Sequence, residues 1–176
     1  MSEKLPSREQ ALKFLRESQC SVNVIQHCRA VAKLALEIGE ACREKGLNVD
    51  LELVEIGALL HDVGRSKTHT VNHAVVGAEI AKSAGLPEPV ISVIKRHVGG
   101  GITISEAEKL GWPKDVYVPV TLEEKIVSYA DKLIEGSKRV PIEITIEKLS
   151  RELKGDAAER VRKLREEITG LVGDCV

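Results

Sequence analysis

A histidine and an aspartate, His61 and Asp62, stand next to each other at the end of a nearly continuous apolar run, residues 56–60. If a hydrophobic helix carries this pair into the interior, an unsatisfied buried charge there costs on the order of several kcal/mol. A bound metal ion or a counter-charge removes that cost. The pair therefore makes a metal site the first hypothesis for this chain.

Further ligands for such a site lie in two distant segments. His27 lies upstream beside the apolar stripe of one predicted helix, and Asp131 lies far downstream on another. Two imidazoles and two carboxylates form a mixed ligand set that suits Mn, Fe, Co, Ni or Mg better than the thiolate-rich sites that zinc often occupies. Four protein ligands leave two openings in an octahedral shell. One opening can hold an activated water and the other a substrate oxygen.

The order of these residues, a His, then the His-Asp pair, then an Asp, resembles the HD superfamily of metal-dependent phosphohydrolases. The segment His61–Arg65 is similar to the signature variant in which a hydrophobic residue, Gly and a basic residue follow the pair. The resemblance covers about residues 20–136 and is strongest to small archaeal-type HD proteins of unassigned substrate. It implies an all-α HD fold and hydrolysis of phosphate mono- or diesters. The expected substrate is a nucleotide or another small phosphorylated metabolite.

The resemblance also gives roles to two later histidines, His73 and His97. Two-metal members of the superfamily carry further histidines on the helices after the motif and use the motif aspartate as a bridge. A second ion would then bind at His73 and His97, with Asp62 shared between the two ions. If only one ion binds, both histidines would contact phosphate or donate a proton to the leaving group. We therefore take Asp62, His73 and His97 as candidate catalytic residues, with one or two ions left open.

Basic side chains near the motif are expected to hold the phosphate. Arg65 and Lys67 follow the His-Asp pair, and the planar guanidinium of Arg65 can bind two phosphate oxygens at once. Lys95 and Arg96 are candidates on the opposite wall of the site. Structural roles stay open as well, because Arg65 can cap the preceding helix and Lys67 can be a solvated surface residue.

Length and composition limit the other functions that the chain can have. Its 176 residues favour a single domain, with an HD core over about 20–136 and C-terminal helices over about 145–172 that form an appendage or a homodimer surface. A net charge of -1, with one Trp, two Tyr and one Phe, argues against nucleic acid as a partner. No signal peptide and no membrane-spanning run is visible, so we expect a cytoplasmic protein and no membrane partner.

Apolar periodicity and capping signals predict helices along the whole chain. Residues 98–120 are instead expected to form a long excursion with one short helix, and such excursions often grip a substrate. The predicted helices cover about residues 7–18, 22–45, 50–62, 72–83, 87–97, 105–110, 121–134, 145–153 and 156–171.

Two other functions compete with hydrolysis. Some HD relatives carry a di-iron pair and oxygenate small alcohols or phosphonates, and the pair His73 and His97 keeps that function open. The other is a module without catalysis that holds a metal or a nucleotide as a sensor.

Overall fold

The computed structural model describes residues 4–152 and 155–174, and within these ranges the chain is all-α apart from one short hairpin. This confirms the predicted fold class. The helices are α1 (Arg8–Glu17), α2 (Val22–Glu44), α3 (Leu51–Leu60), α4 (His73–Ser83), α5 (Glu88–Arg96), α6 (Ile104–Lys109), α7 (Leu122–Lys132), α8 (Ile142–Glu152) and α9 (Ala157–Val172), with 3₁₀ turns η1 (Val63–Ser66) and η2 (Val98–Gly100).

Local capping signals set several of the helix starts. Ser7 and Thr121 each accept a hydrogen bond from a backbone N–H three residues later, and the side chains of Gln10 and Glu124 accept one from the cap residue's own backbone N–H. These are the two capping boxes that the sequence predicts before α1 and α7. After α2, Gly46 takes a φ of 83°, which favours glycine and ends the helix.

The chain departs from the prediction after α7. The helix expected over 121–134 ends at Lys132, and Ile134 lies in strand β1 (Ile134–Glu135) rather than on the helix. Strand β1 pairs antiparallel with β2 (Lys138–Arg139). Gly136, at a φ of 60°, stands in the turn between the strands, in a region that glycine enters without strain.

Helix α8 starts earlier than the sequence analysis expects. The sequence pattern predicts a start at Thr145, but the helix begins at Ile142, directly after Pro141. The fixed φ of proline suits a helix start, and Ile142 extends the buried stripe of α8 by one turn. The predicted end of this helix, Leu153, lies outside the described residues.

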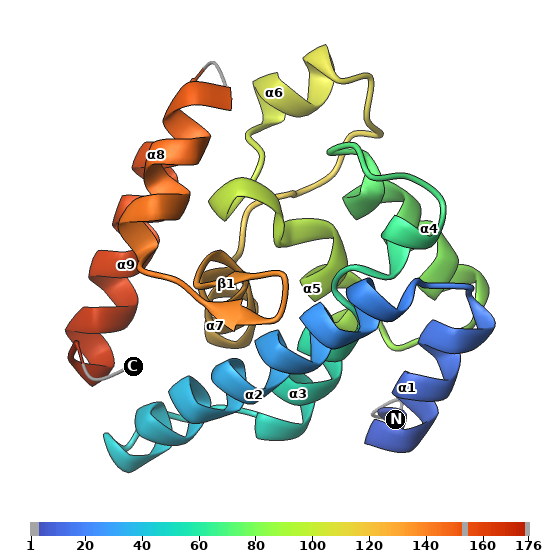
Figure 1. Cartoon of the computed structure of the whole chain (residues 1–176), viewed down its shortest axis with the longest axis horizontal. Helices are drawn as coiled ribbons and strands as arrows, with labels where there is room; N and C mark the ends of the chain where they lie inside the picture. The colour runs from blue at the N-terminus through green and yellow to red at the C-terminus, as the bar shows by residue number, and fades with distance from the viewer. Residues whose placement is uncertain (1–3, 153–154, 175–176) are drawn as a thin grey trace.

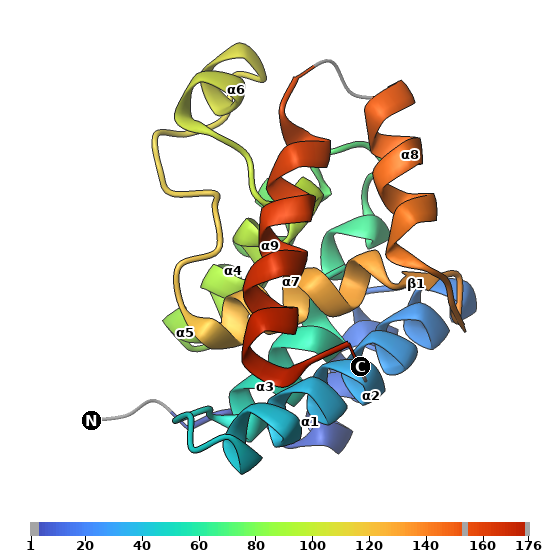
Figure 2. The ribbon, with the colours of Figure 1, turned by 90° about the vertical axis from the view of Figure 1, so that its left-hand side faces the viewer.

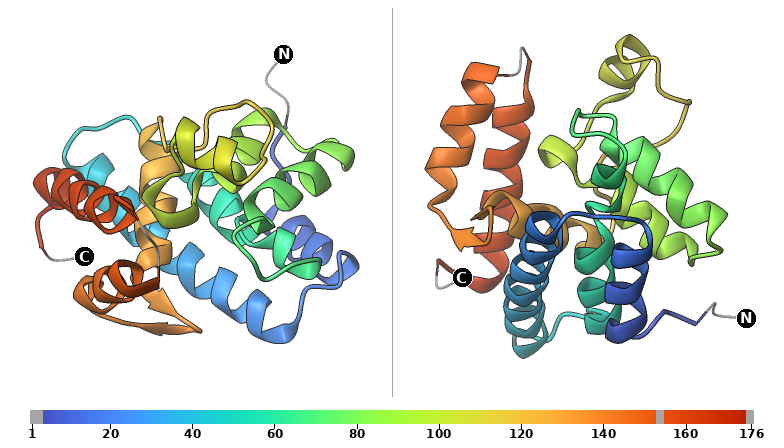
Figure 3. Two further views of the ribbon diagram at one scale, coloured as in Figure 1. Left: turned by 90° about the horizontal axis from the view of Figure 1, so that it is seen from above. Right: turned by 45° about the vertical axis from the view of Figure 1, so that its right-hand side comes forward.

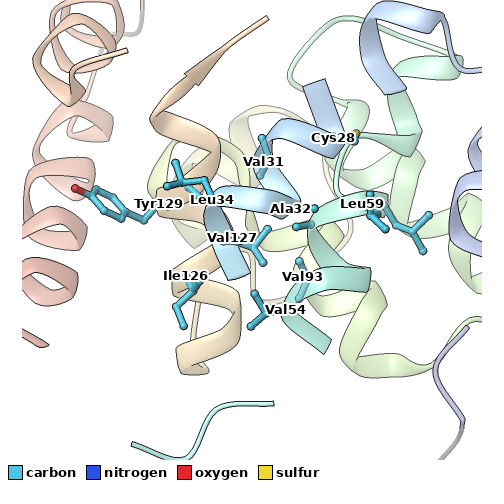
Figure 4. Close-up of a cluster of buried hydrophobic side chains, with 14 of the residues drawn as sticks. Cys28, Val31, Ala32, Leu34, Val54, Leu59, Val93, Ile126, Val127 and Tyr129 are labelled. Atoms are coloured by element: carbon cyan, nitrogen blue, oxygen red, sulfur yellow. The ribbon is translucent and has the colours of Figure 1, made fainter. Parts of the chain in front are cut away.

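Most of the helices pack around one large apolar core, and a smaller apolar cluster lies between α4 and the excursion. Helix α2 packs along α3 and α7, and α5 packs against α3 and α4 (Figure 1). On the other side of α7, α9 runs across it and α8 packs against α9 (Figure 2). Figure 4 shows how α2, α3, α5 and α7 meet through buried side chains. The central ones include Cys28, Val31, Ala32, Val54, Leu59, Val93 and Val127.

A close backbone contact joins η1 to α4. A Cβ atom on Gly64 would stand 1.9 Å from the carbonyl oxygen of His73 and 2.7 Å from the backbone nitrogen of Gly77. Only glycine fits this contact. The glycine of the motif therefore allows the first turn of α4, which carries His73, to pack against the turn that follows Asp62.

The excursion over residues 98–120 carries α6, which stands at the end of the molecule opposite α1, α2 and α3, and then returns to the start of α7 (Figures 1 and 3). Arg160 of α9 donates to both carboxylate oxygens of Glu106, at 3.0 and 2.9 Å, and to the carbonyl of Gly101. Trp112 is buried and donates from its indole N–H to Asn72. The excursion is therefore attached to both α9 and the start of α4. Of the described helices, none is both long and apolar enough to cross a bilayer.

Candidate metal centre

Three helices bring the first group of candidate ligands together. His27 comes from α2, His61 follows α3, and Asp131 lies in the last turn of α7. The Oδ1 atom of Asp131 lies 3.0 Å from Nε2 of His27 and 3.3 Å from Nε2 of His61. Donor atoms of these three residues all lie within 4.8 Å of one another. The three segments predicted to supply ligands therefore do meet.

Asp62 faces two groups of histidines at once. Its Oδ2 atom lies 3.7 Å from Nε2 of His27 and 3.6 Å from Nε2 of His61. Its Oδ1 atom lies 3.2 Å from Nε2 of His73 and 3.3 Å from Nε2 of His97. The carboxylate of Asp62 thus stands between the first group and a second pair of imidazoles.

All four histidines direct the same ring nitrogen into this cluster. Each Nδ1 lies 2.6–2.7 Å from a main-chain carbonyl oxygen, and a carbonyl can only accept, so each Nδ1 must donate its proton. When the ring is neutral, its Nε2 is therefore unprotonated, which is the form that binds metals. The carbonyls belong to Gly136 for His27, Ala58 for His61, Thr70 for His73 and Ile94 for His97.

The buried polar atoms of the cluster and their spacing suit a bound cation. Nε2 of His61 and Oδ1 of Asp62 are buried and have no hydrogen-bond partner among the described residues. Buried polar atoms without partners are rare in folded proteins and often mark an ion site. The separations of 3.0–3.7 Å also match cis ligands at about 2.1 Å from one octahedral ion, which lie about 3 Å apart. These residues can therefore hold a divalent ion.

The electrostatics of the cluster follow from its burial and its charges. Burial opposes ionisation of Asp62, but the charge of His61 and the adjacent imidazoles of His73 and His97 hold its pKa well below 3.8. Burial likewise opposes a charge on His61, and Asp62 nevertheless raises the pKa of that ring well above 6.5. Burial lowers the pKa of His97 to about 4. The carboxylate therefore stays ionised, and a proton on His61 partly offsets it when no metal is bound.

The cluster reaches solvent on one side only. The side chains of His27 and Asp131 are each 16% exposed, whereas His61, Asp62 and His97 are at most 4% exposed. A ligand from solvent would therefore meet the first group of histidines before the second.

The predicted phosphate contacts divide into two pairs. Arg65 donates from Nε to Oδ2 of Asp62 at 2.9 Å, with its side chain 31% exposed, and Lys67 is exposed one residue beyond η1. The structure thus brings Arg65 to the rim of the cluster.

Lys95 and Arg96 have other partners. Lys95 lies 2.8 Å from Asp115, and Arg96 donates to both oxygens of Glu124. Both therefore connect α5 to residues 115–124, and the described residues show no contact between them and the cluster. We leave this pair out of the proposed substrate contacts.

Sequence reasoning missed one charged residue of the site, Lys132. Its ammonium lies 2.5 Å from Oδ2 of Asp131 and 3.2 Å from the carbonyl oxygen of His97, and it is buried. Its position directly after Asp131 was a signal, because a lysine in an apolar helix needs a counter-charge. The carbonyl acceptors were also missed. Three of them precede their histidine by three residues, which is a spacing that the sequence does contain.

The fold and the cluster together define an all-α protein with a buried histidine–aspartate cluster that could hold a metal ion. The HD domain family model matches residues 24–136, which is more than half of the chain. The chain belongs to the HD domain family, which confirms the resemblance inferred from the motif.

Known relatives extend this comparison. The chain is 47% identical over 166 residues to an uncharacterised protein of Methanocaldococcus jannaschii, covering 93% of this chain and 98% of that protein. It is 39% identical to a tRNA (cytidine(56)-2'-O)-methyltransferase of Thermoplasma volcanium, matching 96% of this chain but only 48% of the relative. It is 33% identical to Ribonuclease Y of Acidothermus cellulolyticus over 73% of this chain and 23% of that protein. The chain thus spans about half of the methyltransferase and about a quarter of the ribonuclease.

A solved structure shares the fold. The HD domain of the phosphodiesterase PgpH from L. monocytogenes, in complex with cyclic-di-AMP, superposes with a TM-score of 0.53 at 21% identity. The match covers 94% of this chain and 98% of that one. At this identity the likeness establishes the fold alone.

Proposed function

We propose that this protein is a metal-dependent phosphohydrolase that cleaves a small phosphate mono- or diester, with a nucleotide or a phosphorylated metabolite as substrate. The observation that carries the proposal is the convergence of four imidazole Nε2 atoms on two carboxylates, with every Nδ1 already bonded to a carbonyl. Membership of the HD domain family supports it.

The proposed ligands form two sites that share Asp62. His27, His61, Asp62 and Asp131 would hold one ion, and His73 and His97 would hold a second together with Asp62. Mn, Fe, Co, Ni or Mg suits this set of donors. A bound divalent ion supplies Lewis-acid chemistry, because it lowers the pKa of water and polarises a phosphoryl oxygen.

The chain's own residues then orient the substrate. Arg65 lies at the rim and can offer its remaining N–H groups to a phosphoryl oxygen while its Nε stays on Asp62. Lys67 lies further out and adds a positive charge that attracts the substrate. The buried walls around His61 and His97 exclude bulk water from the reacting phosphorus.

Charge balance favours an anionic substrate. The two carboxylates, Asp62 and Asp131, are each matched by one cation, Arg65 and Lys132. Any divalent ion therefore adds its full charge to a site that is otherwise close to neutral. Trp112 is buried against other side chains, so the described residues show no open stacking platform for a base there.

A phosphodiester within RNA is a second candidate substrate. It is favoured by the 33% identity to a segment of Ribonuclease Y. The balanced net charge of the chain argues for a short RNA rather than a long one.

The test is an activity screen of each metal against each substrate, on protein that has been demetallated and then reconstituted. The panel contains aryl phosphate mono- and diesters, nucleotides, cyclic nucleotides and a short oligoribonucleotide. Asp62→Asn serves as the matched inactive variant, because it keeps the shape of the side chain and removes its charge. We expect hydrolysis of at least one of these esters, and we expect it to require both the metal and Asp62.

Two results would contradict hydrolysis. Metal-loaded protein that is inactive on the whole panel, but whose melting temperature rises with one nucleotide, would identify a binding module. Oxygen uptake by the iron form on a small alcohol or phosphonate would identify an oxygenase.

A further inference from the structure

Lys132 is a buried ammonium group held by two partners. It is 8% exposed, its Nζ lies 2.5 Å from Oδ2 of Asp131, and it donates to the carbonyl of His97 at 3.2 Å. The hydroxyl of Ser128, one turn earlier on α7, donates to the same carbonyl at 3.1 Å. The ammonium is therefore fixed in place. It pairs with Oδ2 of Asp131, while Oδ1 of the same carboxylate faces His27.

Arg65, the second cation of the cluster, is more exposed to solvent than Lys132. Arg65 lies 2.9 Å from Asp62, but its side chain is 31% exposed, so solvent and ligands can screen or displace it. Lys132 is shielded from solvent by α7 and by the start of η2. Its charge consequently acts on the metal site at low screening, whatever is bound there.

The position of Lys132 has two opposite electrostatic effects. A unit positive charge about 5 Å from a divalent ion weakens binding of that ion by roughly tenfold, even with the dielectric constant of water. The same charge strengthens binding of an anion next to the metal, by roughly fivefold for a dianion a few ångströms further away. A residue with only a packing role has neither effect.

We infer that the buried charge of Lys132, held beside Asp131, lowers the affinity of the site for the metal and raises its affinity for a phosphate ligand. This inference rests on the proposed function, because it assumes a divalent ion at the His27, His61 and Asp131 group. It adds a role for a residue that contacts neither the metal nor the substrate.

The experiment compares two neutral variants, Lys132→Met and Lys132→Gln, with Lys132→Arg, which keeps the charge. Lys125→Met is the matched control, because Lys125 lies two turns earlier on α7 and pairs with Glu167 at 2.6 Å, away from the cluster. Two dissociation constants are measured for each folded protein. One is for Mn²⁺, by competition with a chelator, and the other is for inorganic phosphate, by calorimetry on the Mn²⁺-loaded protein.

We expect both neutral variants to bind Mn²⁺ about tenfold more tightly and phosphate about fivefold more weakly than wild type. The Arg variant and the Lys125 control should stay within twofold of wild type. Because Gln keeps an N–H donor, it tests the charge even if the Met variant does not fold.

Three results would overturn the inference. Weaker Mn²⁺ binding in the neutral variants would mean that Lys132 only holds Asp131 in position. Unchanged dissociation constants would mean that the charge of Lys132 does not affect binding of Mn²⁺ or phosphate. Wild-type protein that binds no Mn²⁺ would refute the proposed function and this inference together, whereas the first two results refute the inference alone.

Discussion

Nε2 of His73 lies 3.0 Å from Nε2 of His97, and in two neutral rings that donate from Nδ1 neither Nε2 carries a proton. Each ring gives its Nδ1 proton to a carbonyl, Thr70 for one and Ile94 for the other. The lone pairs of two unprotonated nitrogens this close repel each other. A cation that both nitrogens and a nearby carboxylate bind would remove this repulsion. Asp62 supplies that carboxylate at 3.2 and 3.3 Å.

This geometry predicts how many metal ions each variant retains. His97→Ala should lose the second ion and keep the first, so that the metal content falls from about two ions per chain to about one. Asp62→Ala removes the ligand shared by both groups and should retain none and lose all phosphatase activity. Elemental analysis after reconstitution and desalting measures this directly.

His69→Ala is the control for that experiment. His69 is exposed in the loop after η1, and its side chain makes no described contact with the cluster. It should keep the wild-type metal content. Full metal content in the Asp62 variant would contradict the assignment of ligands.

The second prediction concerns Gly64, whose Cα faces the carbonyl oxygen of His73. Gly64→Ala would place a methyl group 1.9 Å from that oxygen, and backbone cannot move away as a side chain can. We expect the free energy of unfolding to fall by about 3 kcal/mol or more, at the upper end for overpacking. Denaturant unfolding at neutral pH measures it.

Gly170→Ala is the matched control for Gly64. Gly170 lies within α9 and is exposed, and a Cβ atom added to it would meet no described atom within 4 Å. Alanine there should stabilise the protein by about 0.5–1 kcal/mol, because it favours the helix. If both variants unfolded alike, the close contact between η1 and α4 would not exist in solution.

The third prediction is that Lys67 helps to bind the substrate without taking part in the chemistry. It is exposed and lies beyond the buried cluster, so its charge acts on the substrate before and during the reaction alike. Lys67→Ala should raise KM severalfold on the best aryl phosphate and leave kcat within about twofold. A large loss of kcat at unchanged KM would refute this role.

The sequence predicts those features of the fold and the site that depend on a few residues close together in the chain. The capping boxes at Ser7 and Thr121 define helix starts by local hydrogen bonds, and both occur in the structure. The sequence pattern placed four imidazoles, His27, His61, His73 and His97, on or beside predicted helices, and the structure brings all of them together. Their roles as ligands stay predictions.

The rest depended on contacts that are distant in sequence. The carbonyl of Gly136 orients His27 across 109 positions, and the pair Glu124 and Arg96 spans 28. No periodicity shows such partners. The sequence therefore predicts Lys95 and Arg96 as phosphate contacts. In the structure they pair with Asp115 and Glu124 instead. The turn at Gly136 was missed because a two-residue strand leaves no alternating pattern.

The last prediction concerns the attachment of the excursion to α9. The carboxylate of Glu106 is partly buried, which opposes its charge, but hydrogen bonds from Thr103 and Arg160 lower its pKa below 4.5. A carboxyl group with a lowered pKa stabilises the fold above its ordinary value, and that stability is lost as pH falls through the folded pKa. The contribution of this pair should therefore be complete at pH 7 and decline below about pH 4.5.

Arg160→Met tests this, because it removes the guanidinium and keeps most of the side chain's length. At pH 7 it should lower the free energy of unfolding by about 1.5–3 kcal/mol, as expected for hydrogen bonds to a charged group. The difference from wild type should narrow as pH falls below about 4.5, because protonation of Glu106 removes the same interaction from wild type. Arg162→Met, whose partner Glu159 is half exposed, should change stability little at any pH. A difference between Arg160→Met and wild type that stayed constant from pH 7 to pH 3 would show that Arg160 acts by packing and by its hydrogen bond to Gly101, and not through the charge of Glu106.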